Sequence, residues 1–279
     1  MAEPTVPVAD AKPQGALGSS SVPKLELKGL YISYTDRQGK TVQAVEDVNL
    51  TIANKPGVGE LAVFLGPSGC GKSTILKAIC GLLRPDSGEV LIDGVRATGT
   101  GRDRGMVFQN YTSFAWRSVR KNVEYGLELQ GIPAKQRKEQ ALAIIEQVGL
   151  KDFAEALPKQ LSGGMKQRVA IARTLINKPK LLLMDEPFGA LDVMTREQMN
   201  LELMRIWSES QKTTILITHS IQEAVFLADR VVVMTPRPGR VAALVDVDLP
   251  RPRLPETRLS PRFLELAQRV GKLIGLDFL

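Results

Sequence analysis

The chain has 279 residues, of which 43% are hydrophobic and 24% are charged, and these values are typical of a globular protein with a packed core. Its formal net charge of +7 permits contact with nucleic acid or an anionic membrane surface, but a solvated basic surface explains it equally well. Only two cysteines are present, which excludes a disulfide-stapled secreted domain and favours reduced thiols in a cytosolic protein.

The first 23 residues are rich in Ala, Pro, Gly and Ser, and this composition predicts a disordered tail over residues 1–23. They lack the basic start and apolar stretch of a secretory signal. No apolar run in the sequence approaches the ~20 residues that a membrane-spanning helix needs. We therefore expect a protein that stays inside the cell, either soluble or attached to a membrane surface.

Residues 25–52 have a strand-like pattern around a polar turn at 36–40, which predicts two or three antiparallel strands. A short apolar run at 59–66 predicts a buried strand. It is followed by a glycine-rich loop and a helix through 75–83, which turn residues at 84–88 end.

Further strands are expected at 89–94 and 104–109, and helical patterns fill residues 117–157. Three apolar runs, at 181–187, 214–219 and 230–234, then alternate with helical stretches. This alternation predicts an α/β fold with a mostly parallel sheet covered by helices, preceded by an antiparallel β subdomain. Beyond 236 the chain is rich in Pro and Arg before a predicted helix at 263–275.

The loop after the first buried strand carries the phosphate-binding P-loop pattern. Its glycines allow backbone N–H groups to close around phosphate oxygens. Lys72 is expected to reach the β- and γ-phosphates, and the Ser73 hydroxyl is expected to bind Mg²⁺. The predicted nucleotide-binding residues here are Gly66, Pro67, Ser68, Gly69, Cys70, Gly71, Lys72, Ser73 and Thr74.

Two carboxylates end the apolar run at 181–187. Asp185 is placed to hold Mg²⁺, and Glu186 to orient and deprotonate an attacking water. His219, the only histidine of the chain, ends the next apolar run at the same expected edge of the sheet, where it can contact the γ-phosphate. A GTPase is excluded, because Lys180 stands where the guanine-reading Asp would be and cannot accept hydrogen bonds from guanine.

A second anion-binding turn follows in the stretch LSGGMKQR at 161–168, where a serine and two glycines open a helix. A chain that binds one nucleotide has no evident need for it. The whole set of motifs resembles the ATPase subunit of ATP-binding-cassette (ABC) transporters over about residues 24–240. This implies a RecA-like P-loop core with an inserted helical subdomain at about 110–165, followed by a Pro/Arg-rich linker and C-terminal helix over 241–279.

The resemblance also implies roles for single residues. Gln109 matches the loop glutamine that contacts Mg²⁺ and water, Asp192 lies in the dimer-contact loop, and His219 is the switch histidine. Tyr34 matches the aromatic residue that stacks on adenine, although Tyr31 is close by. In the family the signature turn binds the ATP held by a second subunit, which here implies Ser162, Gly163, Gly164 and Gln167.

The implied partners are a second copy of the chain, membrane-spanning permease subunits and, indirectly, a solute-binding protein. The implied location is the cytoplasmic face of the inner membrane, with ATP and Mg²⁺ as cofactors and no nucleic acid. The stretches around 107–131 and 234–253 are similar to the branch that imports nitrate, taurine and aliphatic sulfonates. That branch usually has Leu-Pro-Trp where this chain has Phe114-Ala115-Trp116.

Two other functions account for part of the sequence. A soluble mechanical ABC ATPase acting on nucleic acid or the ribosome is compatible with the positive charge. Such proteins, however, typically contain a long coiled coil, zinc-binding cysteines or two fused cassettes. A small-molecule kinase would use the same P-loop but leaves the signature turn and Asp192 unexplained.

Overall fold

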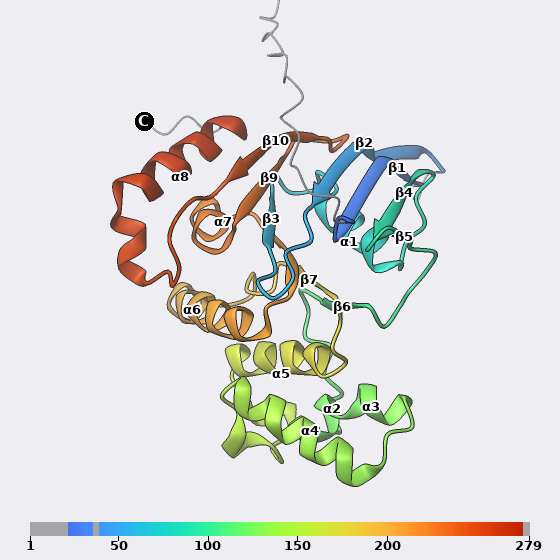
Figure 1. The fold of residues 1–279 in the computed structure, drawn as a ribbon, viewed down its shortest axis with the longest axis vertical. Coiled ribbons are helices and arrows are strands. Elements are labelled where there is room, and N and C mark those ends of the chain that lie inside the picture. The colour runs from blue at the N-terminus through green and yellow to red at the C-terminus, as the bar shows by residue number, and fades with distance from the viewer. Residues whose placement is uncertain (1–21, 36–38, 276–279) are drawn as a thin grey trace, which may run out of the picture.

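The structure, a computed structural model, describes residues 22–35 and 39–275. Within these residues the chain forms two β-sheets and a set of helices, shown as a ribbon in Figure 1. Residues 1–21, which make up most of the expected disordered tail, lie outside the described residues.

The larger sheet consists of β3 (Leu61–Leu65), β6 (Arg104–Val107), β7 (Leu181–Asp185), β8 (Thr213–Thr218), β9 (Arg230–Met234) and β10 (Val241–Asp246). Their order is β10-β9-β3-β8-β7-β6. All neighbours pair in parallel except β10, which pairs antiparallel with β9 at one edge. The predicted α/β fold with a mostly parallel sheet is therefore confirmed.

The smaller sheet consists of β1 (Leu25–Thr35), β2 (Thr41–Ile52), β4 (Ser87–Ile92) and β5 (Val95–Arg96), in the order β2-β1-β4-β5. All its pairings are antiparallel. The predicted N-terminal antiparallel sheet is therefore present, and it also includes two strands, β4 and β5, that follow the P-loop helix in sequence.

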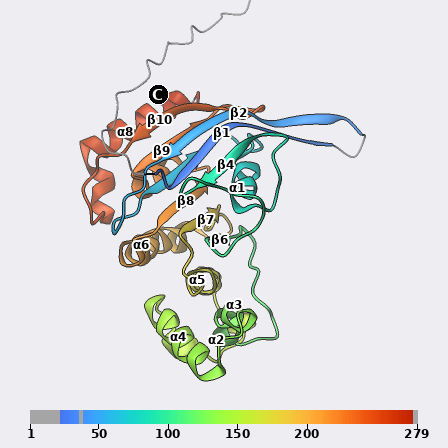
Figure 2. The same cartoon turned by 45° about the vertical axis from the view of Figure 1, so that its right-hand side comes forward.

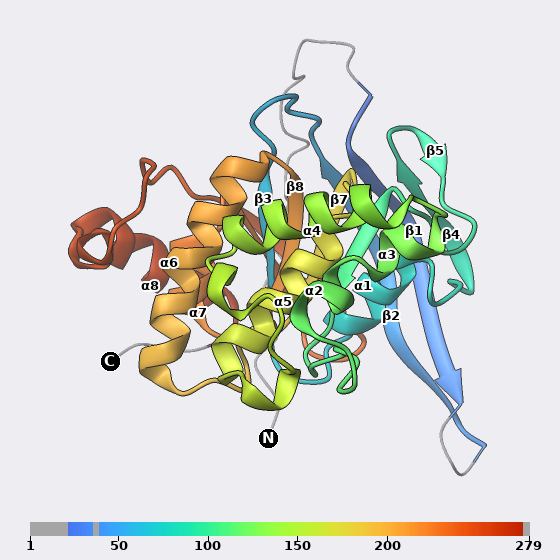
Figure 3. The ribbon, with the colours of Figure 1, turned by 90° about the horizontal axis from the view of Figure 1, so that it is seen from below.

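The α-helices are α1 (Lys72–Cys80), α2 (Val119–Val123), α3 (Tyr125–Leu129), α4 (Ala134–Gln147), α5 (Gly163–Leu175), α6 (Val193–Ser210), α7 (Ile221–Leu227) and α8 (Pro261–Leu273). Short 3-10 turns are η1 (Lys151–Phe153), η2 (Pro158–Gln160) and η3 (Pro255–Leu259). Figure 2 shows α2, α3 and α4 at the end of the molecule farthest from β1 and β2. Seen from below in Figure 3, they lie with α5 in front of the sheets.

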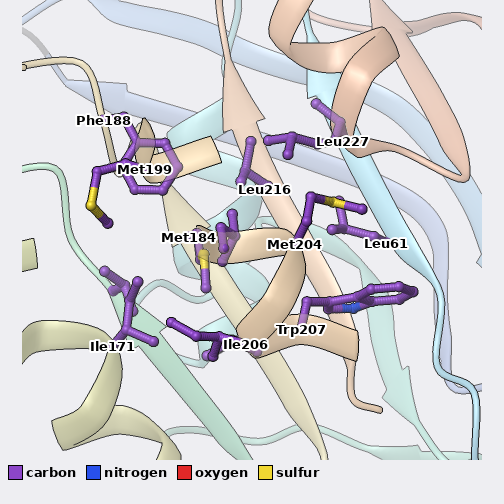
Figure 4. Close-up of a cluster of buried hydrophobic side chains, with 14 of the residues drawn as sticks. Leu61, Ile171, Met184, Phe188, Met199, Met204, Ile206, Trp207, Leu216 and Leu227 are labelled. Atoms are coloured by element: carbon purple, nitrogen blue, oxygen red, sulfur yellow. The ribbon is translucent and has the colours of Figure 1, made fainter. Parts of the chain in front are cut away.

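Strand β3 shows why the buried strands read as unbroken apolar runs. Leu61, Val63 and Leu65 belong to a hydrophobic cluster that includes side chains of α5, α6 and α7, which Figure 4 shows in part. Ala62 and Phe64 belong to a second cluster, with side chains of α1 and the antiparallel sheet. Because both faces of the strand are covered, each residue is apolar and period-two alternation is lost.

Two elements differ from the sequence-based expectation. Helix α1 ends at Cys80, earlier than expected, because Gly81 takes a left-handed conformation with φ of 79° and closes it. A Cβ at Gly81 would lie 1.9 Å from the carbonyl oxygen of Gly99, so only glycine fits. Residues 241–246, expected to be linker, form β10, because they extend the main sheet by pairing with β9.

Candidate functional site

The P-loop connects β3 to α1 and is folded by two left-handed glycines, Gly69 with φ of 76° and Gly71 with φ of 99°. A Cβ at Gly71 would lie 2.8 Å from both the carbonyl oxygen of Ala44 and Cγ2 of Val45 on β2. The antiparallel sheet thus closes against the turn, and only glycine fits there. The N-terminus of α1 is directed toward this turn, where phosphate oxygens bind well.

Lys72 is 5% exposed and lies inside the turn that it follows. Its Nζ donates to the carbonyl oxygens of Gly66 at 2.8 Å and Pro67 at 3.0 Å. Phosphate oxygens are better acceptors for an ammonium group than neutral carbonyls. The side chain is therefore already placed where a bound phosphate would take over these hydrogen bonds.

The first carboxylate of the site, Asp185, ends β7 beside the start of α1. The Ser73 hydroxyl donates to Asp185 Oδ1 at 2.8 Å. Burial raises the pKa of Asp185, and the hydrogen bond from Ser73 opposes this effect. Hydroxyl and carboxylate oxygens next to a phosphate-binding turn are the ligands that Mg²⁺ prefers, so the residues present fit this ion.

Glu186, the next residue, has a left-handed backbone with φ of 42°, which is unusual for a residue other than glycine. Its amide N–H donates to the carbonyl oxygen of Ile217 on β8 at 3.2 Å. Its Oε2 accepts from Gln109 Nε2 at 3.3 Å and lies 3.4 Å from Nδ1 of His219. The structure thus brings the three predicted catalytic side chains, Gln109, Glu186 and His219, together.

A cavity of about 180 Å³ extends along the P-loop. Tyr34 lines it and Tyr31 does not. The sequence alone does not decide which of these two tyrosines is near the nucleotide, and the structure places Tyr34 there. Arg237 also lines it, although the sequence motifs do not identify it as a site residue. The sequence feature that could have indicated it is the Pro/Arg-rich stretch after β9. The cavity is lined by Tyr34, Ala44, Ser68, Gly69, Gly71, Lys72, Ser73, Thr74, Glu186 and Arg237.

The signature turn is separate from this cavity. Ser162 caps α5 and accepts from the N–H of Met165 at 3.3 Å, and Gly163 begins the helix. Gln167, by contrast, has 0% exposure, and neither atom of its amide has a hydrogen-bond partner among the described residues. Its side chain is therefore not on the surface that Ser162 presents.

Asp192 lies near the signature turn. Its Oδ1 accepts from the N–H of Thr195 at 2.9 Å and caps α6, and this hydrogen bond lowers the pKa of Asp192. A Cβ at Gly163 would lie 2.9 Å from Cδ2 of Leu191. The loop from Glu186 to Asp192 therefore connects the P-loop cavity to the signature turn within one chain.

Comparison with known proteins gives consistent matches. A family model described as ABC transporter matches residues 45–189. The chain is 51% identical over 236 residues to an uncharacterized ABC transporter ATP-binding protein of Methanocaldococcus jannaschii, covering 85% of this chain and 86% of that protein. It is 45% identical over 256 residues to the nitrate import ATP-binding protein NrtD of Synechocystis sp., covering 90% and 94%. It is 46% identical over 249 residues to the taurine import ATP-binding protein TauB of Rhizobium johnstonii, covering 87% and 93%.

Solved structures of ATP-binding cassettes are also similar to this chain. An ATP-binding cassette solved as a dimer in a post-hydrolysis state with ADP and Pi has a TM-score of 0.67 and 33% identity, covering 80% of this chain and 98% of that one. A component of the cbiONQ ABC transporter complex from Clostridium perfringens has a TM-score of 0.71 and 26% identity, covering 91% and 99%. Among the described residues, no helix is both long and apolar enough to cross a membrane. The chain therefore belongs to the ABC transporter family, as an ATP-binding subunit that hydrolyses ATP.

Proposed function

We propose that the chain is the ATPase subunit of an importer, in which two copies clamp two molecules of Mg-ATP and couple hydrolysis to uptake of a small solute. The observation that carries this proposal is the placement of Glu186 between Gln109 and His219, beside the P-loop cavity. We assign the ATPase domain to residues about 24–240, with the helical subdomain at about 110–165.

The residues that line the cavity and those that contact Ser73 and Glu186 beside it have separate chemical roles. Lys72 and the N–H groups of the P-loop bind the phosphates, and Ser73 and Asp185 would hold Mg²⁺, which would neutralise phosphate charge. Glu186 accepts a proton from the attacking water. Gln109 orients that water and would contact Mg²⁺, and His219 contacts the γ-phosphate.

The signature turn acts on the nucleotide of the second copy. Within the described residues, Ser162 does not line the P-loop cavity of its own chain. A capped helix N-terminus with two glycines still favours an anion. A head-to-tail homodimer brings this turn, with Ser162, Gly163 and Gly164, to the ATP held by the partner, and Asp192 to the dimer contact, whereas the buried side chain of Gln167 does not reach that surface. The dimeric state of a similar cassette supports this arrangement.

The membrane partner is a pair of membrane-spanning permease subunits, which the chain contacts at the cytoplasmic face of the inner membrane. An aromatic and cationic cluster after Gln109 supplies the contact surface, in which the Phe114 ring lies 5.5 Å from that of Trp116 and 4.8 Å from that of Tyr125. Trp116 is 77% exposed. Exposed aromatic residues of this kind are frequent anchors in protein interfaces.

The cargo belongs to the class of nitrate, taurine or aliphatic sulfonate. This class is supported by the similarity to a nitrate and a taurine import ATPase, whose alignments cover 90% and 87% of this chain. Solute choice would reside in the permease and a solute-binding protein.

Co-purification tests the proposal. The chain is tagged at its N-terminus, membranes are extracted in mild detergent, and the bound proteins are identified. A polytopic membrane subunit recovered in equal amount supports the importer. Recovery of the chain only in the soluble fraction, with nucleic acid or ribosomes, would contradict the importer and support a soluble mechanical ATPase. The proposed ATP chemistry would not be affected by this result.

A further inference from the structure

The loop between β9 and β10, residues 235–240, packs directly on the P-loop. The N–H of Gly239 donates to the carbonyl oxygen of Ala44 at 2.9 Å, and Gly239 accepts in turn from the N–H of Glu46 at 3.0 Å. A Cβ at Gly239 would lie 1.8 Å from the carbonyl oxygen of Cys70, so the two backbones are in contact. The loop is therefore held in place between β2 and the P-loop.

This loop presents the side chain of Arg237 to the nucleotide cavity. Arg237 Nε donates to the carbonyl oxygen of Gly69 at 3.1 Å. The central carbon of its guanidinium lies 5.7 Å from the centroid of the Tyr34 ring. Both side chains line the cavity that also contains Lys72 and Thr74. A planar cation and an aromatic ring thus lie close together at one part of the phosphate-binding cavity.

We propose that Arg237 is a nucleotide-binding residue that holds the adenine base between its guanidinium and the ring of Tyr34. The proposal goes beyond the proposed function but depends on it for ATP binding at the P-loop, and it depends on the family resemblance for the role of Tyr34 at the adenine. Nucleobases stack both on aromatic rings and on arginine guanidinium planes. The arrangement therefore offers a favourable surface to each face of one base.

The spacing fits this role. A base stacked on both faces needs about 7 Å between the two flanking groups, because each stacking contact takes roughly 3.5 Å. The guanidinium lies 5.7 Å from the ring centroid. A long, flexible arginine side chain supplies the remaining ~1–2 Å by a small rotamer adjustment, while the loop backbone stays in place.

The test compares the Arg237→Ala variant with the wild type by titration calorimetry against two ligands, ATP and inorganic tripolyphosphate. Loss of one stacked guanidinium should weaken ATP binding by about 5- to 30-fold. Binding of tripolyphosphate, which has no base, should stay within about twofold. Arg237→Lys keeps the charge but lacks the plane, and should resemble Arg237→Ala.

Arg240→Ala is the matched control, because Arg240 is on the same loop and pairs with Glu46 at 2.7 Å. It removes the same charge and should bind both ligands like the wild type. ATP affinity of Arg237→Ala within twofold of the wild type would overturn the proposal. An equal loss of tripolyphosphate binding would do so too, since Arg237 would then act on the phosphates or on the shape of the P-loop. Full recovery with lysine would likewise exclude stacking.

The same titrations separate this proposal from the function on which it depends. If the wild type binds both ligands and Lys72→Ala loses both, the P-loop assignment holds whatever Arg237 does. If the wild type binds tripolyphosphate and ATP equally well, the base makes no contact, and both the Tyr34 and the Arg237 assignments fail together.

Discussion

Replacing Glu186 with glutamine isolates the proton-accepting role proposed for its carboxylate. The two side chains are nearly the same size, and the amide oxygen of glutamine can still accept the 3.3 Å hydrogen bond from Gln109. What the variant loses is the ability to take a proton from water. General-base catalysis contributes about 10²–10⁴ in rate, which corresponds to about 3–5 kcal/mol of activation free energy. Turnover should fall by that factor.

The assay measures phosphate release, ATP affinity and the molecular mass in solution. ATP affinity should change little, because the P-loop and Lys72 are untouched. With hydrolysis blocked, Mg-ATP should accumulate a stable dimer, visible by light scattering. Glu209→Gln is the matched control, since Glu209 is on the surface near the end of α6, where it pairs with Arg205 at 2.7 Å. That variant should keep wild-type turnover.

Two results would refute the reasoning. Turnover of Glu186→Gln within tenfold of the wild type would show that another group accepts the proton. A variant that remains monomeric at saturating Mg-ATP, and also when held on its membrane partner, would remove the two-copy clamp from the mechanism.

Three further predictions follow from the same geometry. Lys72→Ala should lose most of its ATP affinity by calorimetry, and unchanged affinity would contradict the role given to this ammonium. Ser162→Phe should bind ATP normally as an isolated subunit but block hydrolysis, so normal phosphate release would exclude the signature turn from the active site. Glu223→Gln tests a carboxyl with 7% exposure that accepts from the Thr218 hydroxyl and whose pKa burial raises. Because the folded state keeps this proton to a higher pH than the unfolded state, the wild type should lose stability as pH rises from about 4.3 through the raised pKa. The glutamine variant should gain stability relative to the wild type over that range in urea unfolding, and parallel pH profiles would contradict the assignment.

The sequence predicts best those features of the structure that are determined by consecutive residues. The P-loop pattern determines both the turn and the start of α1, because glycine conformations and the helix N-terminus are encoded in consecutive residues. The apolar runs likewise predict β3, β7, β8 and β9, because a strand covered on both faces needs apolar residues throughout. These segments account for Lys72, Ser73 and Asp185 in the site.

What the sequence does not reveal depends on contacts between distant segments. Arg237 contacts Gly69, which is 168 residues away in the chain, so the local sequence around either residue does not predict the contact. The left-handed backbone of Glu186 is contrary to the preference of this residue type, and it occurs together with a hydrogen bond to β8, a segment about 30 residues away in sequence. The sequence predicts a linker at residues 241–246 because the surrounding stretch is rich in Pro and Arg, whereas pairing with β9 makes these residues strand β10.

The loop between Glu186 and Asp192 explains how one chain can use two anion-binding turns. It is held by hydrogen bonds from the N–H of Gly189 to the carbonyl oxygen of Glu186 and from the N–H of Leu191 to that of Phe188, both at 3.1 Å. At one end Glu186 lines the cavity of its own P-loop, and at the other Leu191 lies against Gly163 of the signature turn. In the proposed dimer the signature turn contacts the partner's nucleotide. If the signature turn contacts the partner's nucleotide as proposed, these six residues, 186–191, would couple the two nucleotide sites, and loss of one γ-phosphate would loosen both halves of the clamp together.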